Sequence, residues 1–221
     1  MRECVRMKKL NDRGSALVMV IVVVTFISIL ATTMLYISGM NFQMKVTDYN
    51  TKISFYEAEV PLEELRTQLV EDASTASAEA YRDVMAEYMT LGTADVRAAR
   101  FQELFYQNMR DIWTARKTNP LNPAEVKWSI AIKSVLSDKY DNCVQNMDTA
   151  ISWQIDAATN TLRLCGFEVI YTDAKGYTSV IETDFSISPP LLSWDGNPVS
   201  SGSGGSSDLN DCVSYVNWEK R

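Results

Sequence analysis

An uncharged apolar stretch from Ser15 to Ile37 constrains this chain more than any other feature of its sequence. Its 23 residues contain no charged side chain and consist mainly of valine, isoleucine and leucine. A helix of that length spans a hydrocarbon core of roughly 30 Å. The β-branched block from Val20 to Val24 would favour a strand in water, but in lipid a helix satisfies its own backbone polar groups. We therefore predict a transmembrane helix over residues 15–37.

The charges in front of this stretch predict its orientation. The first 14 residues carry a net charge of +3, from Arg2, Arg6, Lys8, Lys9 and Arg13 against Glu3 and Asp12. Because positive flanks stay in the cytoplasm, residues 1–14 are predicted to be a cytoplasmic leader and the rest of the chain to be exported. A cleaved secretory signal would have a shorter apolar region and an A-x-A-like exit, neither of which is found here. A plain signal anchor remains an alternative.

Two motifs resemble those of type IV minor pilins and pseudopilins. The junction Arg13-Gly14-Ser15 places Gly directly before the apolar helix, as in prepilins, where a prepilin peptidase cuts after the Gly and the new N-terminus is usually methylated. The segment FYEAEVPLEELRTQL, from Phe55 to Leu69, resembles the aromatic-x-A-E-x-x-L-E-x-x-x-x-L signature of PilX-type minor pilins. The resemblance covers residues 1 to about 70, and it implies cleavage between Gly14 and Ser15.

The same resemblance implies partners and a location. The partners would be other pilin subunits, the prepilin peptidase and the membrane. The chain would be a single-pass protein of the bacterial cytoplasmic membrane with its N-terminus inside, and its exported headgroup would lie at the cell surface or in a filament.

The fifth position of the implied mature chain departs from the major pilins. Those proteins carry a Glu there, which pairs with the N-terminal amine of a neighbouring subunit, whereas this chain has Met19. An unpaired carboxylate in lipid is costly, so its absence is informative. The K-type minor pseudopilin of type II secretion also lacks it and lies at the filament tip. The resemblance therefore implies a place at the tip or in initiation, although some minor pilins simply lack this Glu.

Residues 38–72 are predicted to continue the helix with two apolar stripes on different faces. The first stripe has a period of 3.5 residues and consists of Phe42, Val46, Tyr49, Ile53, Tyr56 and Val60. The second stripe consists of Phe55, Ala58, Leu62, Leu65 and Leu69. The change of face falls near Pro61, which is expected to kink the helix. Either the first stripe packs on neighbouring filament helices and the second on the chain's own domain, or both belong to one amphipathic helix against one core.

The remaining residues predict an α+β fold, pilin-like in its order of elements. Residues 73–118 are predicted to be the helical part of the headgroup, and residues 124–190 an antiparallel sheet. Its strands are expected at 126–136 and, three of them, between 152 and 187, with turns at Asp156–Asn160 and Asp173–Gly176. Residues 191–211 read as a flexible Gly/Ser linker, and residues 212–221 as a terminal edge strand.

Composition excludes several functions. The chain carries a net charge of −7, and without its +3 leader the exported part carries −10, which argues against nucleic-acid binding. It contains no His, the usual general base, and no phosphate-binding loop, so we predict no enzymatic activity and no cofactor. No metal site is predicted either, because Asp138, Asp141 and Asp148 lack the spacing of a calcium loop.

Three cysteines are expected in the exported part, where disulfides persist: Cys143, Cys165 and Cys212. An odd number allows at most one bridge within the chain, Cys143–Cys165 or Cys165–Cys212. The alternative is three unpaired, partly buried thiols.

These observations favour a minor pilin-like subunit that assembles through its N-terminal helix. The alternative is a single-pass, membrane-anchored interaction or sensor domain outside the cytoplasm.

Overall fold

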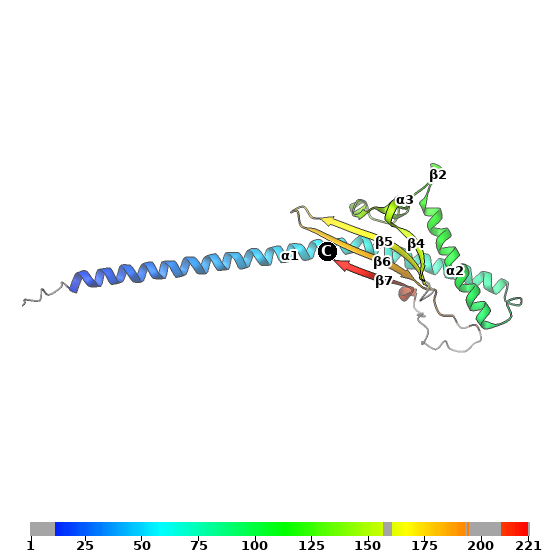
Figure 1. Ribbon diagram of the computed structural model, residues 1–221, viewed down its shortest axis with the longest axis horizontal. Helices are drawn as coiled ribbons and strands as arrows, with labels where there is room; N and C mark the ends of the chain where they lie inside the picture. Colours follow the sequence, from blue (N-terminus) through cyan, green and yellow to red (C-terminus); the bar gives the residue numbers. More distant parts are fainter. Residues whose placement is uncertain (1–11, 157–160, 193, 195–208, 221) are drawn as a thin grey trace, which may run out of the picture. The chain divides into compact units, whose positions relative to one another are not determined.

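The computed structural model describes residues 12–156, 161–192, 194 and 209–220 (Figure 1). The chain divides into two units, residues 1–50 and residues 51–221, and we call the second unit the headgroup. The structure confirms the predicted α+β class, with a long N-terminal helix, further helices and a C-terminal antiparallel sheet. The helices are α1 (Asp12–Ala86), α2 (Ala94–Lys117), α3 (Trp128–Lys133), α4 (Met147–Ala150) and the 3₁₀ turns η1 (Asp138–Tyr140) and η2 (Leu209–Cys212). The strands are β1 (Thr118–Asn119), β2 (Asn122–Val126), β3 (Val144–Gln145), β4 (Ser152–Asp156), β5 (Thr161–Thr172), β6 (Thr178–Ile187) and β7 (Val213–Lys220).

The first unit is the N-terminal part of α1, and its apolar stretch suits a membrane. α1 is long and apolar enough here to cross a bilayer, and the side chains of that window are not buried. Its hydroxyl groups donate hydrogen bonds to carbonyls of the preceding turn, at 2.8–2.9 Å from Thr25, Ser28, Thr32 and Thr33. These four hydroxyls are thus satisfied by the helix itself, as a hydrocarbon environment requires.

In the headgroup, α1 buries one face along its whole length. The buried positions recur every three or four residues, which is the spacing of one helical face. They are Ala58, Leu62, Leu65, Leu69, Ala73, Ala76, Ala80 and Val84, all with 0% exposure. The helix continues through Pro61 and past residue 72 to Ala86, so the expected division into a helix to 72 and a separate helical region from 73 differs from the structure. The division falls instead at a turn around Gly92, whose φ is +69°, before α2.

The sheet has the order β3-β5-β6-β7, with β4 also paired to β5, and these pairings are all antiparallel. β5 and β6 bury alternate side chains against α1 and α2: Leu162, Leu164, Phe167, Val169, Ile181, Phe185 and Ile187. A bulge between Leu164 and Phe167 keeps both of these side chains inside. Gly166 makes the bulge feasible, because its φ is +92° and a Cβ there would lie 2.3 Å from the Ala150 carbonyl oxygen.

The predicted strand at 126–136 is wrong, because α3 occupies most of it. Trp128, Ala131 and Ile132 are buried at spacings of three and four residues, so the same letters that alternate as a strand also fit one helical face. The ring of Trp128 packs in a cluster with Trp113 and Trp153, with centroids 5.9–6.5 Å apart.

The predicted linker over 191–211 is too long at both ends. Trp194 packs on the core, with its ring centroid 5.8 Å from those of Tyr81 and Phe101. At the other end, residues 209–212 form η2 directly before β7. The Gly/Ser-rich centre, residues 195–208, lies outside the described residues, as do positions 157–160 of the predicted turn at Asp156–Asn160.

The predicted disulfide is absent among the described cysteines. The Cys143 carbonyl accepts from the Ile170 amide at 2.8 Å, which places Cys143 about five residues, or roughly 16 Å, along β5 from Cys165. The Cys212 carbonyl accepts from the Ser188 amide beyond the end of β6, whereas Cys165 lies in β5, roughly 10 Å away across the strands. Both separations exceed the Cα distance of about 7 Å that a disulfide can bridge.

Candidate helix-packing surface

The first stripe and the second stripe lie on opposite faces of α1. In the headgroup, Leu65 is fully buried, whereas Tyr56, nine residues or 2.5 turns away, is 62% exposed. Ile53 is also exposed and Val60 is half-buried. In the first unit, Phe42, Val46 and Tyr49 are exposed in the same way. α1 therefore carries a buried core face and an exposed apolar face, and the exposed face is available for another protein.

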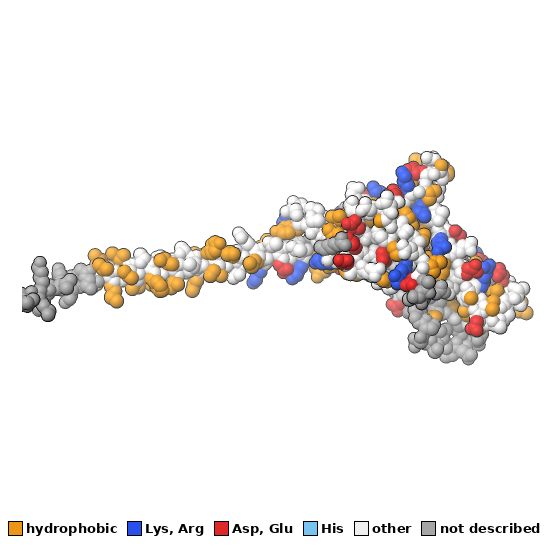
Figure 2. Space-filling model, viewed as in Figure 1, with side chains coloured by type: hydrophobic (Ala, Val, Ile, Leu, Met, Phe, Trp, Pro, Cys, Tyr) orange, Lys and Arg blue, Asp and Glu red, His pale blue; other side chains and the backbone are white. Residues whose placement is uncertain are grey.

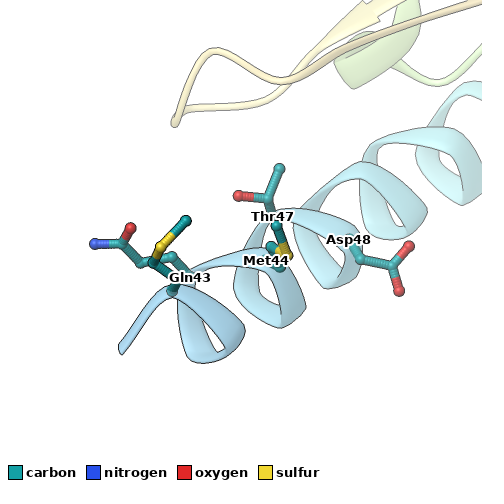
Figure 3. A pocket seen from close by; sticks show the side chains of 5 residues that line it. Gln43, Met44, Thr47 and Asp48 are labelled. Atoms are coloured by element: carbon teal, nitrogen blue, oxygen red, sulfur yellow. The ribbon is translucent and has the colours of Figure 1, made fainter. Parts of the chain in front are cut away.

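A second apolar surface lies on the first unit just after the membrane-spanning stretch. Met40, Gln43, Met44, Thr47 and Asp48 line a shallow hollow of about 460 Å³ on α1, and Figure 3 shows four of these side chains projecting from the helix. In Figure 2, hydrophobic side chains cover the helix before this point and charged ones follow. Met side chains adapt to irregular neighbours, so this hollow suits contact with lipid or with another helix.

Within the headgroup, the acidic segment of α1, residues 57–64, contacts η1 and the residue before it on one side. The Tyr140 hydroxyl donates to Glu57 Oε2 at 2.6 Å, and the Lys139 ammonium forms an ion pair with the same oxygen. About two turns further along α1, Glu64 accepts hydrogen bonds from the backbone amide of Ser137, at 2.9 Å, and from its hydroxyl. Hydrogen bonds from Lys139 and Tyr140 lower the pKa of Glu57 below its ordinary value.

β7 holds the other side of the same helical segment. The Tyr215 hydroxyl donates to Glu63 Oε1 at 2.8 Å, and the Arg66 guanidinium donates to the Asn210 carbonyl at 3.0 Å. The Lys220 ammonium lies 3.9 Å from the centre of the Phe55 ring. Burial, followed by the hydrogen bond to Glu63, raises the pKa of Tyr215 far above its ordinary value.

These contacts involve three of the four glutamates in the acidic segment, which are Glu57, Glu59, Glu63 and Glu64. Charged residues on a helix commonly form a solvated face. Three of the four instead bind the region of η1 and the strand β7 to α1. Sequence reasoning missed this role because their partners lie 73–152 residues away along the chain. The remaining one, Glu59, is half-buried, and its pKa is raised by burial and then by the negative charge of Glu63, with Lys220 offsetting part of the shift.

A groove of about 570 Å³ runs along the outer face of this segment, and we call it the outer groove. Its lining comes from α1 and from the chain just after α3: Tyr56, Glu59, Val60, Glu63, Glu64, Thr67, Gln68, Val135 and Ser137. Two residues of the first stripe, the exposed Tyr56 and the half-buried Val60, form part of it. This arrangement combines apolar contact area with carboxylates, which is suited to binding a protein partner.

The other predicted positions lie in the first unit. Gly14 and Ser15 belong to the first turn of α1, and the leader residues 1–11 lie outside the described residues. Met19 lies on the apolar stretch with 70% exposure.

Among the described residues, no group of His, Cys, Asp and Glu is arranged to hold a metal ion. Asp148, one of the three aspartates considered for calcium, accepts hydrogen bonds from the amide and hydroxyl of Ser129, at 2.8 and 2.9 Å.

Comparison of the chain with protein-family models, with curated proteins and with solved structures gave no match.

Proposed function

We propose that this chain is a minor pilin-like subunit of a type IV pilus or related filament, which assembles through its N-terminal helix. The observation that carries this proposal is the two-faced character of α1. One helix of 75 residues begins with an exposed apolar stretch and continues into the headgroup, where it buries only one face against its own core. A helix of this kind can leave lipid and pack against other helices without disturbing the headgroup.

The chemistry of the first unit supports such a transfer. Association of helices from lipid is driven by close packing, because lipid tails are as apolar as the side chains. The hydroxyls of Thr25, Ser28, Thr32 and Thr33 already bond within the helix, so the move leaves these four groups satisfied. The basic leader keeps the N-terminus in the cytoplasm until a prepilin peptidase cuts between Gly14 and Ser15.

Contacts of the acidic segment within the headgroup also support the transfer of the subunit from the membrane into a filament. Glu57, Glu63 and Glu64 attach η1 and β7 to α1, so force on the helix is transmitted to the headgroup through several polar contacts. The segment that resembles the minor-pilin signature thus has a mechanical role within the chain.

Within this proposal, Met19 places the subunit at the filament tip or in initiation. The carboxylate of a major subunit would pair with the amine of the neighbour ahead of it, and Met19 offers no such partner. We expect the native protein to co-purify with sheared filaments and to label their ends in immunoelectron microscopy, and Met19→Glu to move label onto the shaft. Label along the shaft with either residue, and an unchanged number of filaments, would contradict tip placement.

The alternative is a membrane-anchored interaction or sensor domain. Such a protein would stay in the membrane fraction when filaments are sheared, in cells with and without the prepilin peptidase alike. Co-purification with filaments only in peptidase-positive cells would exclude it.

A further inference from the structure

The outer groove has the length of a helix-binding site. Its lining residues on α1 run from Tyr56 to Gln68, which is roughly 18 Å along the helix axis at 1.5 Å per residue. Three turns of a second helix would cover that length. α1 is helical over this whole length, so the groove presents side chains and offers no strand edge to which an extended segment could add.

The charge of the outer groove points to a basic partner. Glu59 and Glu63 lie four residues apart on one face of α1, where like charges repel. Glu63 accepts a hydrogen bond from Tyr215 and forms an ion pair with Arg66 at 3.8 Å, and Glu64 accepts a hydrogen bond from the amide of Ser137. Within the described part of the chain, Glu59 forms no hydrogen bond or ion pair, although it is half-buried. Arg66 pairs with Glu63, and Lys220 offsets part of the negative charge near Glu59, but the groove lining itself contains three glutamates and no lysine or arginine. A lysine or arginine from outside would neutralise the negative charge that remains at Glu59.

We propose that the outer groove receives an α-helix of a neighbouring filament subunit, with a basic side chain of that helix against Glu59 and Glu63. The apolar contacts come from the exposed Tyr56 and from the uncovered parts of Val60 and Val135, which are half-buried against the core. Opposite charges fix the register of the incoming helix, and the apolar contacts supply the packing. This inference rests on the proposed function, since it takes the neighbour to be another filament subunit.

Photo-crosslinking in intact cells tests the proposal. A benzophenone amino acid replaces Thr67 in the groove or, as a control, Thr75, which is exposed on the same helix outside the groove. We expect position 67, and not position 75, to crosslink to another pilin-like subunit in sheared filaments, and mass spectrometry to map the link to a helical segment that contains lysine or arginine. A link to a segment without a basic residue, equal links from both positions, or no link from position 67 in assembled filaments would overturn the proposal.

Charge variants test the role of Glu59 in the same assay. Glu59→Lys should lower the crosslink yield by about tenfold and Glu59→Gln by less, because reversal adds repulsion to the lost attraction. Glu79→Lys, an exposed position of α1 outside the groove, should leave the yield unchanged. Tryptophan fluorescence checks that each variant is folded. An unchanged yield in folded Glu59→Lys would contradict the charge contact.

The outcomes separate this inference from the proposed function. A processed chain that co-purifies with filaments but gives no crosslink from position 67 refutes the groove and leaves the filament function in place. A chain that never enters filaments refutes both, even if position 67 crosslinks to another membrane protein.

Discussion

Replacing Leu65 by Ala should destabilise the headgroup strongly, because Leu65 lies at the centre of the buried face of α1. Its side chain has 0% exposure and is flanked along that face by Leu62 and Leu69, which are equally buried. Truncation of a buried Leu removes its transfer free energy and leaves a cavity, a loss of roughly 2–5 kcal/mol. We expect about 3 kcal/mol here, because the sheet and α2 both pack against this face and limit its collapse.

Urea denaturation of the full chain in detergent micelles measures this loss. The tryptophan cluster of Trp113, Trp128 and Trp153 reports on the core through its fluorescence. With a denaturant slope of about 2 kcal/mol per molar urea, 3 kcal/mol corresponds to a midpoint lower by about 1.5 M.

The matched control is Tyr56→Ala on the exposed face of the same helix. Tyr56 is 62% exposed, so its truncation should change the free energy of unfolding by less than about 0.5 kcal/mol. A loss below 1 kcal/mol for Leu65→Ala, or equal losses for the two variants, would refute the assignment of a buried and an exposed face.

Two further perturbations test the headgroup. Gly166→Ala should destabilise the headgroup more than Gly176→Ala. Both residues have a positive φ, +92° and +86°, but only at Gly166 would the new Cβ lie 2.3 Å from a carbonyl oxygen. Equal melting temperatures of the two variants would contradict this. Hydrogen bonds from Lys139 and then Tyr140 lower the pKa of Glu57 in the folded state from 4.5. The ionised Glu57 therefore stabilises the folded state above pH 4.5, and this stabilisation is lost as the pH falls through the lowered, folded-state pKa. Glu57→Gln should therefore flatten the decline of the urea midpoint in acid, and identical pH profiles would count against the contact.

The long helix and the strands could be predicted because their periodic signals are strong. The buried positions Leu62, Leu65 and Leu69 stand out from the sequence. β6 alternates over ten residues, and β5 alternates on either side of its bulge. The continuation of α1 to Ala86 could not be predicted as firmly, because its buried face changes to Ala73, Ala76 and Ala80. Alanine contributes little to a hydrophobic pattern, although its small size allows another element to pack closely.

Short segments, and contacts between residues far apart in the chain, limited what else the sequence could predict. Six residues from Trp128 to Lys133 satisfy strand and helix periods equally, and packing of Trp128 against Trp113 decides for the helix. In the candidate site, the apolar stripes were visible in the sequence. The attachment of Glu57 to η1 was not, since it depends on how the chain after α3 returns to α1.

The central claim is that the chain is processed and assembled as a pilin, and its intact mass tests this most directly. The protein should be isolated both from membranes and from sheared filaments, in cells with and without the prepilin peptidase. We predict a chain that begins at methylated Ser15 in the peptidase-positive cells, and one that retains its leader in the others. A chain that still begins at Met1 in cells with an active prepilin peptidase would contradict the account.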